Sequence, residues 1–177
     1  GLGIGAFYII ERQGWGDPLL EVNQFMIYYL VGDLYIRYML QKMPITNIKP
    51  LLYLPINKSK IVQYSLGKTV VSFFNWSHAF FFVPFSVVLL VEGYSPVRVV
   101  GWHLGIMALF LCNNFINVLV NNKDNIFYML LGIFSLLGVY QYYELFNITV
   151  YTSPFFNTLY DLPWMAFLTW GLLKALA

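Results

Sequence analysis

Two charged residues stand inside an otherwise apolar stretch, and the chemistry of that stretch depends on them. Asp33 and Arg37 are four positions apart with the acid first, the favourable order for an ion pair on a helix. If the stretch crosses a membrane, each charge is costly and is a functional hypothesis by default. Because each charge has a partner within reach, we favour a structural pair, with Arg37 extending toward the inner membrane surface.

Asparagines mark a second apolar stretch. Asn113, Asn117 and Asn121 recur at helical spacing on one face, and Asn114 lies beside them. Amide side chains in hydrocarbon either bond to neighbouring helices or line a polar path, and we favour the bonding. A stripe of small residues on the same stretch favours close helix packing and consists of Gly101, Gly105 and Ala108. The candidates for a polar path are Asp33, Arg37, Asn113 and Asn117.

The remaining reactive residues favour no enzyme. His78 and His103 fall on consecutive apolar stretches and could ligate haem, but their expected depths differ by roughly a third of a bilayer. We therefore favour two hydrogen-bonded or interfacial histidines. Leu66–Thr69 imitates the end of a phosphate-binding loop, yet Val62 stands where the first glycine is needed. We therefore predict no catalytic residue, no metal site, no bound cofactor and no ATPase site on this chain.

The composition indicates a membrane protein. The chain is 59% hydrophobic, 20% aromatic and 10% charged, whereas a soluble domain has roughly 25% charged residues. The net charge of +2 gives no reason to expect nucleic acid as a partner. The continuous apolar runs are too long for barrel strands. The sequence thus predicts an all-α, polytopic membrane helix bundle embedded in a lipid bilayer.

The apolar runs give the expected spans of a single transmembrane domain, residues 1–177. A span needs about 20 mostly apolar residues. Complete spans are predicted at 22–43, 69–91, 97–120 and 126–146, and partial spans at 1–10 and 163–177. We interpret the two partial spans as truncated, and the sequence as an excerpt of a longer chain.

The lysines predict the orientation of these spans. The connection 44–68 carries Lys49, Lys58, Lys60 and Lys68 and no acid, and Lys42 precedes it. Basic connections remain in the cytoplasm, so this loop is expected inside. Its second half predicts a short amphipathic helix. On physical grounds alone, that helix is either a membrane-surface connector or a docking element for a cytoplasmic partner.

A resemblance favours the docking element. Residues 51–62 read Leu-Leu-Tyr-Leu-Pro-Ile-Asn-Lys-Ser-Lys-Ile-Val and are followed by Gly67-Lys68. This run and the order of spans resemble the ABC-2-type exporter permeases, and in particular their longer bacterial members. In that family this segment is the coupling helix, which sits on the ATP-binding subunit, and a short outer helix or re-entrant segment precedes the last span. The coupling residues that the resemblance implies are Leu54, Pro55, Ile56, Lys58, Lys60, Ile61 and Tyr64.

The same resemblance implies a function and partners. The chain would be the permease subunit of an exporter in a bacterial cytoplasmic membrane, moving an unidentified substrate by alternating access. Its partners would be a cytoplasmic ATPase, which alone binds ATP, and a second permease half or a second copy. Two other classes stay open: a membrane scaffold inside a larger complex, and a redox or lipid-modifying enzyme that uses His78, His103 and the polar residues inside the membrane.

Overall fold

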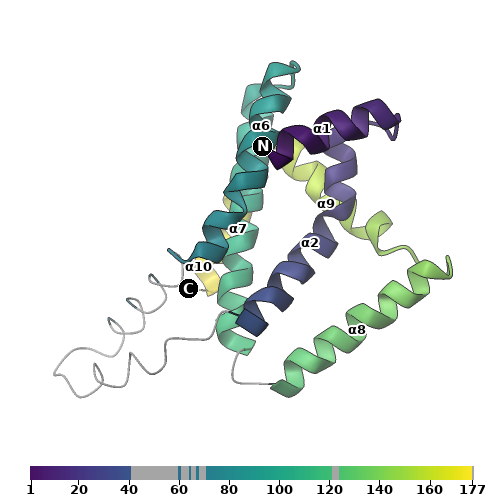
Figure 1. Cartoon of the computed structure of the whole chain (residues 1–177). Coiled ribbons are helices and arrows are strands. Elements are labelled where there is room, and N and C mark those ends of the chain that lie inside the picture. Colours follow the sequence, from purple (N-terminus) through teal and green to yellow (C-terminus); the bar gives the residue numbers. More distant parts are fainter. Residues whose placement is uncertain (41–59, 61–63, 65–66, 68–70, 121–123, 177) are drawn as a thin grey trace.

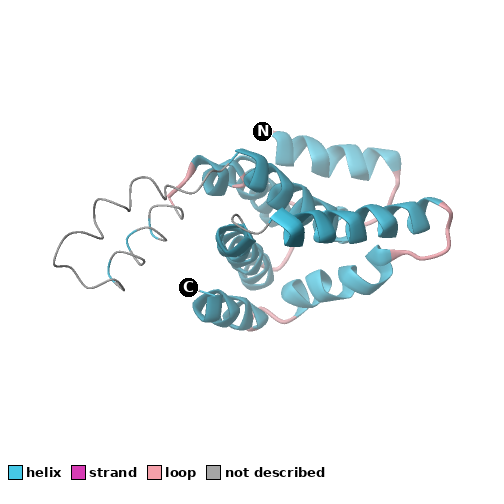
Figure 2. Ribbon diagram, turned by 90° about the horizontal axis from the view of Figure 1, so that it is seen from below, coloured by secondary structure: helices cyan, strands magenta, loops and turns pink. Residues whose placement is uncertain are grey.

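The computed structural model describes residues 1–40, 60, 64, 67, 71–120 and 124–176, and every regular element in these ranges is a helix (Figures 1 and 2). The predicted all-α bundle is therefore confirmed for the described part of the chain. In chain order the helices are α1 (Leu2–Gln13), α2 (Pro18–Leu40), α5 (Phe73–Ser77), α6 (Ala79–Val91), α7 (Pro96–Val120), α8 (Asp124–Tyr142), α9 (Ile148–Asp161) and α10 (Met165–Leu176).

Three described helical stretches are long and apolar enough to cross a membrane. They are Phe73–Val91, which comprises α5, His78 and α6, and the helices α7 and α8. Their bounds lie within a few residues of the predicted spans 69–91, 97–120 and 126–146. These stretches make the chain a membrane protein by the length and composition of its helices.

Helix α2 falls on the remaining predicted span, 22–43. With 23 residues it is long enough to cross a bilayer, but it is not among the three apolar stretches. It contains Asn23, Asp33 and Arg37, and all three side chains are buried inside the protein. The composition of the whole helix therefore understates how apolar its outward surface is.

The helices meet at two chemically different ends. At one end, hydrogen bonds join the connections between helices to one another and to α1: the Tyr94 hydroxyl donates to Asp17 at 3.0 Å, and the Tyr8 hydroxyl of α1 donates to Glu92 at 2.9 Å. Burial and the bond to Asp17 raise the pKa of Tyr94, so this hydroxyl remains a donor. We call this the acidic end, defined by Glu11, Asp17, Glu92 and Asp161.

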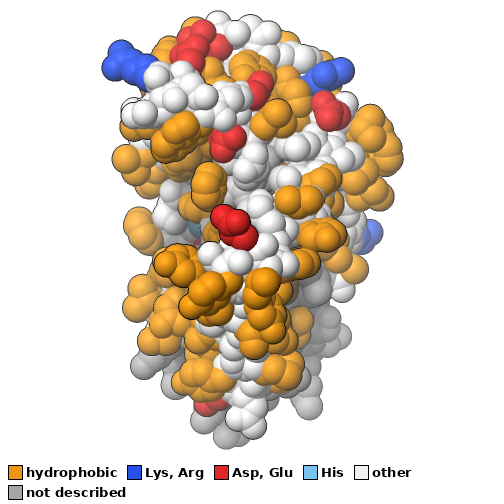
Figure 3. All heavy atoms as spheres, turned by 90° about the vertical axis from the view of Figure 1, so that its right-hand side faces the viewer, with side chains coloured by type: hydrophobic (Ala, Val, Ile, Leu, Met, Phe, Trp, Pro, Cys, Tyr) orange, Lys and Arg blue, Asp and Glu red, His pale blue; other side chains and the backbone are white. Residues whose placement is uncertain are grey.

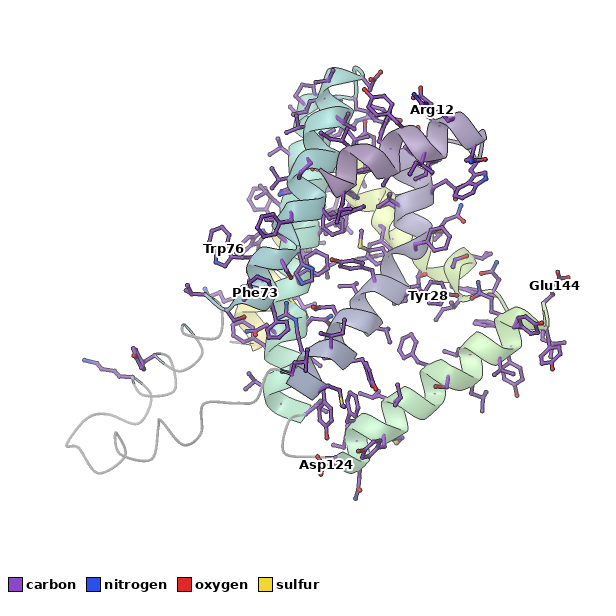
Figure 4. All side chains as sticks on the ribbon, viewed as in Figure 1. Arg12, Tyr28, Phe73, Trp76, Asp124 and Glu144 are labelled. Atoms are coloured by element: carbon purple, nitrogen blue, oxygen red, sulfur yellow. The ribbon has the colours of Figure 1, made fainter. Side chains whose placement is uncertain are left out.

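The opposite end is flanked by the segments that hold the lysines. Leu40 and Phe73 flank one segment, and Val120 and Asp124 flank the other (Figure 1). Six of the seven lysines belong to these segments, and Lys174 lies in the last turn of α10. We call this the lysine end. Figure 4 shows Arg12 and Asp124 at the two opposite ends of the molecule.

Helix α7 is the centre of the bundle and packs against α2, α6, α9 and α10. Its Trp102, Ile106 and Phe110 belong to the main hydrophobic core, together with Phe82 and Phe85 of α6. The predicted close packing at the small-residue stripe is confirmed on α7. A Cβ atom on Gly101 would lie 2.7 Å from Pro163, and one on Gly105 would lie 3.2 Å from Leu159.

Helix α8 contrasts with α7, because Phe127 is its only buried residue. It touches α2 near both of its own ends: the Tyr38 hydroxyl donates to Asp124, and the Tyr28 hydroxyl donates to Gln141. Hydrophobic side chains cover most of the face that Figure 3 shows, and the charged side chains lie mainly toward its upper end. Such a surface suits lipid or another membrane helix.

Helix α1 crosses α6 in close contact, and two of its glycines provide a test. A Cβ atom on Gly3 would lie 2.1 Å from the Phe81 carbonyl oxygen, whereas one on Gly5 would meet nothing within 4 Å. We expect Gly3→Ala to lower the thermal unfolding temperature in detergent, because backbone cannot yield without separating the helices. Gly5→Ala should leave it unchanged or raise it, since alanine favours helix by about 1 kcal/mol. Equal effects of the two substitutions would contradict this contact.

Candidate functional site

The predicted pair of charges on α2 forms in the structure. Arg37 Nε donates to both carboxylate oxygens of Asp33, at 2.9 and 2.8 Å. The helix supplies this geometry, because residues four apart lie on the same face. Asp33 is 7% exposed and Arg37 is 0% exposed. The expectation that Arg37 extends toward the membrane surface is therefore wrong: its guanidinium points into the protein, where it has partners on other helices.

His78 connects the helical stretch Phe73–Val91 to this pair. Its Nε2 atom lies 3.0 Å from Asp33 Oδ1 and 3.1 Å from an Nη atom of Arg37. Its Nδ1 atom lies 2.9 Å from the Tyr29 hydroxyl, which is also on α2. The ring is 4% exposed and stacks on Phe110 of α7, with the ring centroids 3.9 Å apart. His78 is also the joint between α5 and α6, so it connects this joint to α2 and α7.

Two asparagines add α7 to the same group. Asn113 Nδ2 donates to the Leu30 carbonyl oxygen at 2.6 Å and to Asp33 Oδ2 at 3.0 Å. Arg37 Nη1 donates to Asn114 Oδ1 at 3.4 Å. The expectation that the asparagines bond between helices is confirmed for Asn113. We call the whole group the polar lock, and it consists of Tyr29, Asp33, Arg37, His78, Asn113 and Asn114.

The chemistry of the polar lock is that of a joint between helices. Its one carboxylate and one guanidinium neutralise each other, and the surrounding amides and ring nitrogens are hydrogen-bonded. Removing one charged member of such a group leaves the other charge buried without its partner, which is costly. The lock therefore favours one arrangement of α2, α6 and α7, and any second arrangement has to exchange its bonds together.

The other candidate residues do not join this group. Asn117 is 1% exposed, and its Oδ1 atom has no hydrogen-bond partner among the described residues. Leu54, Pro55, Ile56, Lys58 and Ile61 lie outside the described residues. Lys60 and Tyr64 are described, and both side chains are exposed. The coupling residues implied by the resemblance thus stay a prediction.

The histidines have different partners. His103 Nδ1 lies 2.8 Å from the Ser86 hydroxyl, whereas both nitrogens of His78 contact other members of the polar lock. Of the two expected alternatives, hydrogen-bonded or interfacial, both histidines are hydrogen-bonded. A haem iron would have to displace the partners of His78. The described residues also contain no group of three His, Cys, Asp or Glu side chains placed to hold a metal ion.

Sequence reasoning missed the role of His78 in the lock. Its signal is a histidine in an apolar stretch, which predicts a hydrogen-bonded or interfacial residue, a haem ligand or an enzyme residue, but not a contact with Asp33 and Arg37. Which residue reaches Asp33 from another helix depends on the rotation and depth of that helix, and the helical period alone sets neither. The spacing of Asp33 and Arg37, by contrast, lies within one helix.

The helices and the lock together define a class of protein: a helical membrane protein that keeps the Asp33–Arg37 ion pair in its interior, between helices. The chain belongs to a defined family, because residues 1–177 all match the family described as a family of unknown function (DUF5687). Comparisons with curated proteins and with solved structures find no match.

Proposed function

We propose that this chain is the transmembrane permease subunit of an ABC-2-type exporter, which moves its substrate by alternating access while a separate ATPase hydrolyses ATP. The resemblance of residues 51–68 to the coupling segment of that class supports this proposal. So does the order of the helices around it. The lysine end would face the cytoplasm, because lysine-rich connections remain on that side. The chain would then be a multi-pass protein of a bacterial cytoplasmic membrane.

The position of the polar lock is the observation that carries the proposal. Segment 41–72 leaves α2 at Leu40 and enters α5 at Phe73. Arg37 lies four residues before the start of this segment, and His78 lies six residues after its end. The two residues are 3.1 Å apart between their side-chain nitrogens. A force that an ATPase applies to this segment would therefore reach the lock before any other buried contact of α2 with α6.

A lock of this kind suits a protein with two conformations. A ligand or partner shifts such an equilibrium only by the difference in its affinity for the two states. Packed and hydrogen-bonded interfaces change between discrete arrangements and do not deform continuously. In the proposed cycle, the ATPase supplies the bias and the lock transmits it to α2, α6 and α7. The chain itself contributes no catalytic group.

The exposed helix α8 supports the expected second permease half. Only Phe127 of α8 is buried, although the helix is 19 residues long and apolar. Between α8, α2 and α7 lies an apolar groove of about 320 Å³, whose lining includes Leu34, Ile116 and Leu131. A second half or a second copy of the chain would bury this surface when it closes the transport path.

The proposal is tested at the predicted coupling helix. We expect Ile61→Asp to abolish association with the ATPase and to abolish transport-coupled ATP hydrolysis. The substitution would place a carboxylate in an apolar contact, and an unpaired buried charge costs several kcal/mol. The measurement is co-purification of the tagged full-length protein from native membranes, followed by identification of the bound ATPase and assay of its turnover.

Lys58→Ala is the matched control, because an exposed charge pair contributes only about 0–1 kcal/mol. It should retain the ATPase with nearly unchanged turnover. Both variants should insert normally, since position 61 lies outside every predicted span. If Ile61→Asp inserts and retains its ATPase with unchanged turnover, residues 58–66 are not the coupling element. If the native complex contains no ATPase, the scaffold class replaces the exporter class.

A further inference from the structure

One ring nitrogen of His78 has two neighbours that make opposite demands. Nε2 lies 3.0 Å from Asp33 Oδ1, an acceptor, and 3.1 Å from an Nη atom of Arg37, a donor. A ring nitrogen that carries a proton donates a hydrogen bond, and one without a proton accepts. Nε2 therefore cannot bond to both neighbours at once. Whether Nε2 carries a proton decides which of them holds His78.

The other ring nitrogen, Nδ1, can be hydrogen-bonded with or without a proton, because the Tyr29 hydroxyl beside it can accept or donate. With a single proton on Nδ1, the ring donates to Tyr29 and accepts from Arg37. With a single proton on Nε2, it donates to Asp33 and accepts from Tyr29. With both protons, Nδ1 donates to Tyr29, Nε2 donates to Asp33, and the ring no longer accepts from Arg37.

Few charged or titratable side chains of α2 and α7 contact His78. The titratable and charged side chains that contact it from α2 are Tyr29, Asp33 and Arg37. From α7 the ring contact is Phe110, which has no proton to exchange. Asn113 and Asn114 of α7 contact the Asp33 and Arg37 side chains. A proton gained by His78 thus changes the balance between one acid and one base on the same helix.

We propose that His78 is a reversible proton-binding site whose neutral ring carries its proton on Nδ1, and that a second proton, bound at Nε2, transfers the contact between α6 and α2 from Arg37 to Asp33. The proton comes from water, and the N–H bond at His78 is the only covalent bond that the protein gains or loses. His78 lies about 8 Å along the helix from Phe73, at a rise of 1.5 Å per residue, so the site is near the lysine end. Because His78 joins α5 to α6, the exchange acts on the helical stretch Phe73–Val91, which adjoins segment 41–72. This inference concerns the lock alone and does not rest on the proposed function.

The chain offers a sparse set of probes for the test, since it contains two histidines and three arginines. The full-length protein, labelled with ¹⁵N in histidine and arginine side chains, is reconstituted in lipid nanodiscs and followed by NMR from pH 8 to pH 5. Histidine is the side chain that commonly changes charge in this range. His103→Asn assigns the His78 ring signals, and Arg12→Lys and Arg98→Lys assign the Arg37 Nε signal.

We expect both ring nitrogens of His78 to reach the shifts of a doubly protonated ring, and the Arg37 signal to move with the same midpoint. The Arg12 and Arg98 signals at the acidic end should stay fixed over that midpoint. The His103→Asn protein should behave as the unmodified protein does. A His78 ring that keeps one neutral form throughout the range overturns the proton site. A His78 transition that leaves the Arg37 signal unmoved overturns the exchange of contacts.

Discussion

Asp33→Asn is expected to lower the stability of the folded protein by roughly 3–5 kcal/mol, because it leaves the buried Arg37 charge without the Asp33 carboxylate. Arg37 is 0% exposed, and its Nε atom donates to both oxygens of that carboxylate. The double variant Asp33→Asn, Arg37→Gln removes both charges and should recover much of the loss. Reversible unfolding of the unmodified protein, the two single variants Asp33→Asn and Arg37→Gln, and the double variant in mixed micelles gives the coupling energy.

The chain contains a matched control for this cycle. Arg98 and Asp161 form an ion pair at 4.0 Å whose side chains are 51% and 64% exposed. Asp161→Asn should cost no more than about 1 kcal/mol, the usual value of an exposed pair. A double variant at 33 and 37 that is no more stable than the worse single variant would contradict the pairing. It would favour a separate role for Asp33 in binding substrate.

The elements that the sequence predicts well are those that depend on one helix. The continuous apolar runs predict helices α7 and α8 because a span needs a minimum length of apolar residues. The spacing of Asp33 and Arg37 predicts their bond because a helix places residues four apart together. Gly101 and Gly105 predict close packing because only small side chains allow backbones to approach. None of these predictions requires knowledge of a neighbouring helix.

The predictions that failed or were incomplete concern neighbours. The direction of Arg37 depends on His78 and Asn114, which belong to other helices, so the sequence of α2 alone favours the membrane surface. The break at His78 between α5 and α6 has no proline or glycine to mark it. Pro84 does stand inside α6, yet the helix continues through it. Helix α9 also packs on α2 and α7, where its Leu159 is fully buried.

Trp102→Ala is expected to produce the second large loss of stability, roughly 3–5 kcal/mol, because it empties the centre of the core. Trp102 is 0% exposed and lies against the rings of Phe82 and Phe85. Its indole Nε1 donates to Asn23 Oδ1 at 2.9 Å, and Asn23 Nδ2 donates in turn to Asn157 Oδ1 at 2.8 Å. The substitution therefore removes both packing around α7 and a hydrogen bond that links α7 to α2.

Two further tryptophan variants separate these contributions. Trp102→Phe keeps most of the volume and loses the donor to Asn23, so it should cost about 1–3 kcal/mol, the usual price of a buried acceptor without a partner. Trp76→Ala removes a ring that is 63% exposed and points outward from α5 (Figure 4), so it should cost much less than Trp102→Ala. Unfolding in mixed micelles measures all three. Equal losses for Trp102→Ala and Trp76→Ala would contradict the central position of α7, because that position requires the indole of Trp102 to be the buried one.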